Sequence, residues 1–315
     1  MNAGIARALA GSALLALGAG LVAADAPRPT FGVGVLRRDG IVVPFAAFDG
    51  KRWTHAWPEP ALELTVPINV AGIPSRWWGP TRALENWQAW TDGAPQNLRI
   101  VQPDWVNVHC VRQVGLRSDY RSPDAAPPRT EQPYPKDGLA VSPPQPVERI
   151  ATVPLGSDEA RALLPTVHEA FNKAEREVEN AYGHPVSRRA REGRVPDLDA
   201  VYAVGEHPRI YYVEATRGYR LLGQASGDCA TVGFATGWLA REGHEVRSLV
   251  TAVDLLPCNR NGANYMLPLG AMRVTGKLFW LAQFAGWNGE RYVVVEVKPK
   301  TVEAVVNAWG GSCQR

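Results

Sequence analysis

The sequence predicts a mainly β protein built from antiparallel strands, with one long helical insertion. Three observations predict this class. Short apolar runs alternate with turn dipeptides along most of the 315 residues. The chain also contains 11 Trp, 30 Gly and 26 Pro, a combination typical of proteins with many short strands. Only one stretch, residues 157–182, carries apolar side chains at sustained helical spacing.

The best-marked element is a hairpin that runs from Gly276 to Val297. Its first strand places large apolar residues on both faces, with Trp280 on one and Phe279 on the other, which predicts a central strand covered on both sides. Its second strand, residues 291–297, is rich in Val and Tyr, which are good strand formers, and its successive side chains are predicted to point to opposite faces. Asn288-Gly289 is predicted to form a primed turn, because Asn and Gly accept the positive φ that tight hairpins need.

Turn dipeptides recur at intervals of roughly 40–45 residues, the spacing typical of four-stranded propeller blades. The predicted fold is therefore an antiparallel meander, with an irregular β-propeller of about five to six blades as one arrangement. Two antiparallel β-rich (α+β) domains are the alternative. The dipeptides are Asp49-Gly50, Asp92-Gly93, Asp137-Gly138, Gly205-Glu206, Glu242-Gly243 and Asn288-Gly289.

Residues 1–24 have the pattern of a signal peptide. Arg7 precedes an apolar run rich in small residues, and cleavage is expected near Ala24. Export to the periplasm or beyond follows, with an uncleaved anchor as the alternative. No later run is long and apolar enough to span a membrane. The net charge of +3 is too small to indicate a nucleic-acid partner.

The remaining chain divides by composition into three regions. Residues 25–120 form an N-terminal β-rich region. Residues 121–149 contain eight prolines and are predicted to be a linker or long loop that supplies no central strand. Residues 150–315 form a C-terminal β-rich region that includes the helix of residues 157–182. A short second helix is predicted at 301–309, ending at two glycines.

The long helix has clear boundaries. Ser157 is a suitable N-cap and Gly183 a suitable stop. Pro165 is expected to interrupt or restart it, since proline is costly inside a helix. Glu169 and Lys173 lie one turn apart and are predicted to form an ion pair.

Four cysteines in an exported chain suggest two disulfides. A strand that begins near Cys229 turns at Glu242-Gly243 and returns toward Cys258, so a Cys229–Cys258 bond is predicted. Cys110–Cys313 then follows by exclusion. Free buried thiols are the alternative.

No complete catalytic motif is present, and neither a metal site nor a cofactor is predicted. A zinc-protease pattern begins at His168-Glu169 but has Asn172 where the second His should be. His109-Cys110 is predicted to lie within one strand, where neighbouring side chains point to opposite faces and cannot act as a nucleophile–base pair.

Three groups of residues are candidate binding sites. Exposed tryptophans can stack on sugar rings, although core packing is the alternative for such a cluster. An Asn-rich loop beside a disulfide can bind an anionic or sugar ligand, or be a turn that uses Asn for positive φ. The basic loop Arg188–Arg194 can dock an acidic partner or be solvated surface. The first two groups are Trp77, Trp78, Trp87 and Trp90, and Asn259, Arg260, Asn261 and Asn264.

These features favour an exported binding or scaffold module rather than an enzyme, with carbohydrate or another exported protein as candidate partners. The alternative is a secreted hydrolase whose carboxylates are brought together only by the fold. Its candidate acid–base residues are Asp228, Asp254 and Glu214.

Overall fold

The computed structural model describes residues 30–55, 87–128, 130–219 and 229–313. These residues form three sheets in which every strand pair is antiparallel. The largest, the N-terminal sheet, has eight strands in the order β5-β4-β8-β1-β2-β7-β6, with β3 paired to β2. Its strands are β1 (Phe31–Arg37), β2 (Ile41–Phe48), β3 (Trp53–His55), β4 (Trp87–Thr91), β5 (Ala94–Leu98), β6 (Ile100–Val108), β7 (Val111–Ser118) and β8 (Lys136–Ser142).

The other two sheets come from the C-terminal part of the chain. The helix-backed sheet has the order β13-β12-β11-β10-β9, and the central sheet has the order β14-β15-β16-β17. The helix-backed sheet contains β9 (Ala151–Thr152), β10 (Asp197–Val204), β11 (Arg209–Tyr219), β12 (Thr231–Glu242) and β13 (Glu245–Leu256), and α1 (Asp158–Tyr182) and α2 (Arg188–Arg191) precede β10. The central sheet contains β14 (Tyr265–Val274), β15 (Lys277–Ala285), β16 (Gly289–Val297) and β17 (Val302–Ser312).

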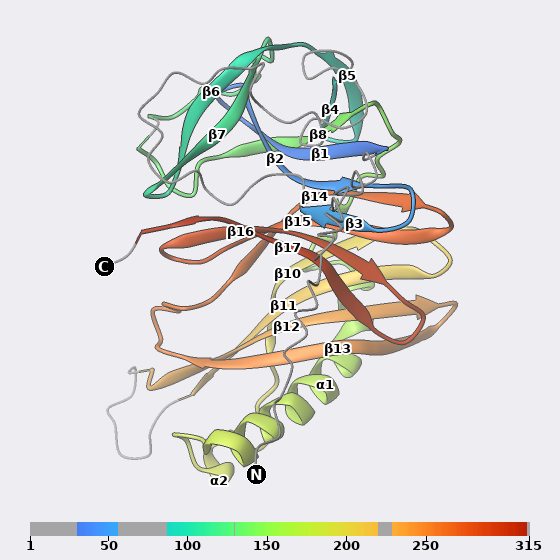
Figure 1. Ribbon diagram of the computed structural model, residues 1–315. Coiled ribbons are helices and arrows are strands. Elements are labelled where there is room, and N and C mark those ends of the chain that lie inside the picture. The colour runs from blue at the N-terminus through green and yellow to red at the C-terminus, as the bar shows by residue number, and fades with distance from the viewer. Residues whose placement is uncertain (1–29, 56–86, 129, 220–228, 314–315) are drawn as a thin grey trace, which may run out of the picture.

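The elements stack in layers: the N-terminal sheet, the central sheet, the helix-backed sheet and α1, from top to bottom in Figure 1. The described residues thus form sheets of eight, five and four strands rather than five or six four-stranded blades, and the propeller arrangement is not confirmed. The coarser prediction of a mainly β, antiparallel protein with one long helix is confirmed.

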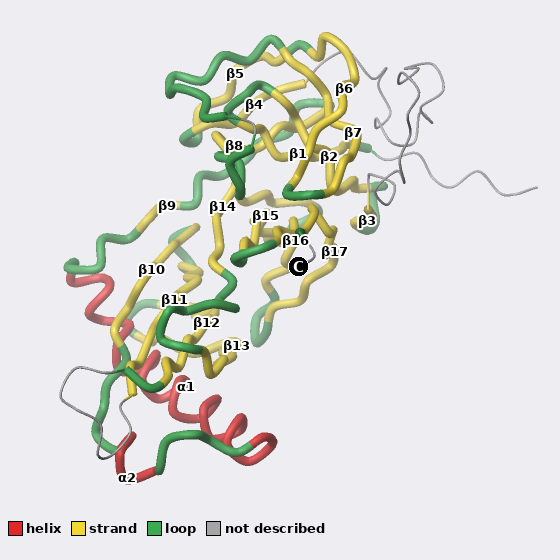
Figure 2. The backbone as a smooth tube through the Cα atoms, turned by 90° about the vertical axis from the view of Figure 1, so that its left-hand side faces the viewer, coloured by secondary structure: helices red, strands yellow, loops and turns green. Residues whose placement is uncertain are grey.

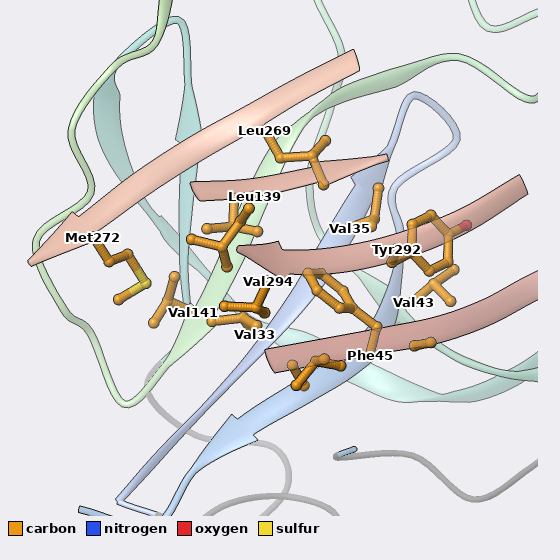
Figure 3. Packing of buried hydrophobic residues seen from close by; sticks show 14 of the residues in the cluster. Val33, Val35, Val43, Phe45, Leu139, Val141, Leu269, Met272, Tyr292 and Val294 are labelled. Atoms are coloured by element: carbon orange, nitrogen blue, oxygen red, sulfur yellow. The ribbon is translucent and has the colours of Figure 1, made fainter. Parts of the chain in front are cut away.

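The central sheet is covered on both faces. Phe279 and Leu281 of β15 join a core with the N-terminal sheet, and Figure 3 shows Val294 and Tyr292 of this layer beside Val33 and Phe45. Trp280 points the other way, into a core shared with Tyr212 and Trp238 of the helix-backed sheet. The prediction of a central strand with two buried faces is confirmed.

The hairpin of β15 and β16 exists, but its predicted turn is wrong. The Gly286 N–H bonds to the Gly289 carbonyl at 2.9 Å, so Trp287 and Asn288 occupy the central turn positions. Neither Asn288 nor Gly289 has positive φ. A primed turn occurs instead at Thr275-Gly276, between β14 and β15, with φ of 51° and 78°.

Two further local predictions are corrected in the N-terminal sheet. The Pro-rich segment 121–149 supplies β8, an interior strand between β4 and β1, because its Lys136–Ser142 stretch lies between the prolines and keeps its N–H groups. His109 and Cys110 do not lie within a strand. They form the turn between β6 and β7, where His109 has a φ of 52°.

The C-terminal helix predicted at 301–309 is also wrong, because this segment is β17. Val306, Ala308 and Gly310 are buried at alternate positions, which is the periodicity of a strand paired with β16. The long helix α1 begins and ends as predicted, and the Ala160 N–H donates to Ser157 Oγ at 3.1 Å. The interruption predicted at Pro165 is wrong, because the helix continues through this residue without a break.

One disulfide and one buried ion pair join the N-terminal sheet to the central sheet, and a second disulfide lies at one end of the helix-backed sheet. The disulfides are Cys110–Cys313 and Cys229–Cys258, the pairings expected from the sequence. The first joins the β6–β7 turn to the end of β17. Lys136 of β8 donates to both carboxylate oxygens of Glu290 on β16 at 2.9 Å. Among the described residues, no helix is both long and apolar enough to cross a membrane.

Candidate functional site

A polar cluster interrupts the apolar contact between the helix-backed and central sheets. On β11, Tyr212, Glu214 and Thr216 share the face that looks toward the central sheet, because side chains two apart on a strand point the same way. Neighbouring β10 has a bulge here. Leu198 pairs with Ala215 and Ala200 with Glu214, so Asp199 is the extra residue. A bulge of this kind re-aims a side chain, and it directs Asp199 toward Thr216.

Asp199, Thr216 and Arg260 form the centre of this cluster, here called the Arg260 site. Arg260 Nη1 lies 2.8 Å from Asp199 Oδ2, and Arg260 Nη2 lies 3.4 Å from Thr216 Oγ1. Thr216 in turn donates to Asp199 Oδ1 at 3.2 Å. The side chains of Arg260 and Asp199 keep 39% and 21% of their surface exposed, so the cluster is both held in place and open to solvent.

Arg260 reaches this position from the loop between β13 and β14. The Cys229–Cys258 disulfide anchors the loop two residues earlier. The Arg260 N–H bonds to the Pro257 carbonyl at 2.8 Å, and Arg260 itself has a positive φ of 57°. A short loop with a covalent anchor loses little conformational entropy when its side chain binds a partner.

Of the four polar residues predicted in this loop, the structure brings only Arg260 into the site. Asn259 Oδ1 accepts a hydrogen bond from the Asn261 N–H at 3.0 Å, and Asn264 Nδ2 lies 3.5 Å from the Gly262 carbonyl. The side chains of Asn259 and Asn264 therefore hydrogen-bond to backbone groups of their own turn, as Asn side chains commonly do.

Glu214 is the buried carboxyl of the site, with 3% of its surface exposed. The backbone N–H of Met266, on the neighbouring edge strand β14, donates to Glu214 Oε1 at 2.7 Å. Burial raises the pKa of Glu214 to about 7, and the Asp199 charge adds to the rise, while the Met266 hydrogen bond opposes it. Near neutral pH this carboxyl can therefore either hold or release a proton.

Tyrosines surround the carboxyl and the rim. Tyr202 and Tyr212 stack at 6.5 Å, and burial followed by the Glu214 charge raises the pKa of both phenols. Tyr265, at the start of β14, keeps 39% of its surface exposed and packs edge-on against Phe234 at 5.3 Å. Phe234 pairs directly with Thr216, so Tyr265 borders the open side of the Arg260 site.

The tryptophan cluster offers no exposed ring among its described members. Trp87 is buried, and Trp90 is half-buried against the core between the N-terminal and central sheets. Both tryptophans are covered because they belong to β4, an interior strand of the N-terminal sheet next to β8. Trp77 and Trp78 lie outside the described residues.

The remaining sequence candidates are spread apart. Asp254 is exposed on β13 and makes no ion pair with Arg260 in the described structure, and Asp228 lies outside the described residues. In the arginine loop, Arg191 is buried and contacts Glu179 at 2.6 Å and Glu175 at 3.4 Å, which ties α2 to α1. Its neighbours Arg188 and Arg189 are exposed.

The sequence pointed to Arg260 and Glu214 separately but missed Asp199, Thr216 and Tyr265. One signal was available: Glu214 and Thr216 follow Ile210 and Tyr212 on one face of the strand, which marks a polar break in a core. The bulge at Asp199 had no such signal.

Within the described ranges, no three His, Cys, Asp or Glu side chains gather as a metal site would require. No family model matches the chain. A search of curated proteins found no match. A search of solved structures also found none.

Proposed function

We propose that this protein is an exported binding protein whose Arg260 site takes a neutral, hydroxyl-rich ligand such as a carbohydrate. The observation that carries the proposal is the state of Arg260. Its guanidinium group is fixed by Asp199 and Thr216 while 39% of the side chain remains exposed. A donor that is already oriented loses little entropy when a ligand binds.

Charge balance favours an uncharged ligand. Asp199 and Arg260 offset each other, and Glu214 is mostly protonated below its pKa of about 7. The site therefore offers donors and acceptors without a net charge, which suits hydroxyl groups. The half-exposed ring of Tyr265 at the rim adds an apolar surface of the kind on which a sugar ring can pack.

The extracytoplasmic setting is supported by the two disulfides, since such bonds persist in oxidising environments. Cleavage near Ala24 remains part of the proposal. Sequencing the N-terminus of the protein secreted by an expressing cell tests it, and a mature chain that still begins at Met1 would count against it.

The binding proposal is tested by screening the folded protein against an array of neutral oligosaccharides. The best ligand is then titrated by calorimetry. Arg260→Ala should weaken binding by about tenfold or more, because it removes a charged hydrogen-bond donor. Arg273→Ala is the matched control, since Arg273 is a half-exposed arginine paired with Glu148 outside the site. Failure of every glycan, or equal binding by Arg260→Ala, rejects the proposal.

A secreted hydrolase is the second candidate, and the raised pKa of Glu214 beside another carboxylate favours it. Two carboxyl groups in different environments can divide the acid and base roles. Glu214 would protonate the leaving oxygen, and Asp199 would take a proton from the attacking water. Hydrolysis of aryl glycosides should then fall on the alkaline side near pH 7 and be lost in Glu214→Gln, with exposed Asp254→Asn as control. Activity that survives in Glu214→Gln excludes this role.

A further inference from the structure

Strand β13 leaves a long sheet edge open. It has twelve residues, pairs with β12 on one side, and ends the order of the helix-backed sheet; the described residues place no strand on its other side. Its middle segment, residues 248–253, is uncharged and free of proline. Natural proteins protect such edges with charges or prolines, because unpaired backbone groups accept a further strand. This edge therefore has the features of a strand-addition site.

In an antiparallel ladder, alternate residues point their backbone N–H and C=O groups toward the partner strand and away from it. The register with β12 therefore identifies which residues of β13 have backbone groups free to pair with an added strand. The Thr166 hydroxyl of α1 donates to the Val246 carbonyl at 3.3 Å, so Val246 presents its backbone groups away from β12. Ser248, two residues further on, also points its backbone groups away from β12. A bulge at Leu249 then shifts this alternation of inward and outward residues by one position. Thr251 and Val253 consequently present the next outward N–H and C=O groups.

A groove runs beside this edge. It has a volume of about 520 Å³ and lies between α1 and the first half of β13. Small side chains, Ala170 and Ala174, form part of its helix wall. Figure 2 shows α1 below β13, at the outer end of the series from β10 to β13. A strand added to β13 would therefore lie along the helix.

Three charged side chains of the helix border the groove. Glu169, Lys173 and Glu177 line it and are exposed. Among the ion pairs of the described residues, none involves these three, so the predicted Glu169–Lys173 pair does not form. Their spacing of four residues corresponds to about 6 Å along the helix. Alternate residues of an extended strand are separated by nearly the same distance, about 6.7 Å.

We propose that this groove binds an extended peptide segment of a partner protein, which pairs with the outer edge of β13 and presents basic, acidic and basic side chains at alternate positions to α1. The acidic–basic–acidic order on the helix is the same in either direction. It therefore selects the charge pattern of the bound peptide but does not determine whether the peptide pairs with β13 in a parallel or an antiparallel orientation. This interaction uses an edge of the molecule distinct from the Arg260 site, and neither proposal depends on the other.

The test uses two fluorescent nine-residue peptides with identical flanks. One has the central sequence Lys-Val-Glu-Val-Lys, and the other has Glu-Val-Lys-Val-Glu. Fluorescence anisotropy with the full chain should show about tenfold tighter binding of the first, since exposed charge pairs are individually weak but three act together. The triple variant Glu169→Lys, Lys173→Glu, Glu177→Lys should reverse the preference.

Thr251→Pro provides the backbone test. It removes an outward N–H without taking a hydrogen bond from the β12–β13 ladder, so both peptides should lose binding. Thr251→Val, which keeps the N–H, should bind as the wild type does. Equal binding of the two peptides, an unchanged preference in the triple variant, or no binding by the folded protein overturns the proposal. The proposal is also overturned if the wild type is a dimer that Thr251→Pro converts to a monomer, because a second copy of the chain would then cover the edge of β13.

Discussion

Glu214 links the chemistry of one residue to the stability of the whole chain. Its pKa rises from 4.5 to about 7 on folding, so the folded state favours the protonated carboxyl. The associated stability is complete below pH 4.5 and is lost as the pH rises through about 7. The shift corresponds to about 3 kcal/mol. Urea unfolding of wild type at pH 4.5 and pH 8 should therefore show a fall of that order attributable to this group.

Glu214→Gln is the matched comparison, because a glutamine cannot titrate. Its free energy of unfolding should change less between the two pH values than that of wild type, with the difference between the two proteins near 3 kcal/mol. Exposed Asp254→Asn serves as the control and should follow wild type. Parallel pH profiles for wild type and Glu214→Gln would show that the carboxyl does not titrate in this window.

Gly138 shows how a single position permits a strand that the sequence did not predict. It lies in β8 with a φ of 156°, and a Cβ atom there would fall 2.0 Å from the Trp90 carbonyl oxygen of β4. Gly138→Ala should cost more than about 2 kcal/mol in chemical unfolding, since backbone must move to relieve the clash. Gly218→Ala is the control, because nothing lies within 4 Å of its Cβ position. Equal midpoints for the two variants would contradict this.

At the scale of elements, the sequence was informative where local signals and tertiary contacts agree. The β15–β16 hairpin has strand-forming residues on both sides of a turn dipeptide, so the sequence predicts its two strands correctly, although not the residues of its turn. The segment of β17 was mistaken for a helix because Glu303, Ala304 and Ala308 suit a helix locally. Pairing with β16 outweighs that preference. Asp199 could not be predicted as a site residue, since its position depends on a bulge and a contact 61 residues away.

Strand β15 provides a test of the two-sided burial. Trp280 is fully buried and its ring centroid lies 4.9 Å from that of Trp238 on the helix-backed sheet. Trp280→Ala should therefore lower the free energy of unfolding by about 3–5 kcal/mol, through lost burial and a cavity. Trp309→Ala, on β17 with 52% of the side chain exposed, should cost much less. Thermal or urea unfolding of both variants makes the comparison, and similar losses would place Trp280 outside the core.

For the whole molecule, the stacking of three sheets follows from pairings between distant segments. Strand β8 pairs with β1, which lies about a hundred residues earlier in the sequence. It is the last strand of the N-terminal sheet in chain order, although it lies inside the sheet. Turn spacing cannot reveal such a pairing, because it reports only on neighbours in sequence. That is why the regular interval of turn dipeptides suggested propeller blades, whereas the described strands assemble into layers of unequal size.

The Cys110–Cys313 disulfide should contribute most to holding those layers together. It closes a loop of 203 residues and joins the N-terminal sheet to the central sheet, whereas Cys229–Cys258 spans 29 residues within one side of the molecule. Loop-closure entropy predicts stabilisation of about 5 kcal/mol for the first bond and about 4 kcal/mol for the second.

Replacing each pair of cysteines by serine should thus destabilise the chain more at 110 and 313 than at 229 and 258, as measured by urea unfolding. Hydrogen exchange adds a spatial readout. Without the first bond, faster exchange should appear in β6, β7 and β17, whose ends it connects. Without the second, the change should centre on β12 and β13. Equal losses with no regional difference would mean that packing between the sheets, and not the long-range bond, sets the stability of their interface.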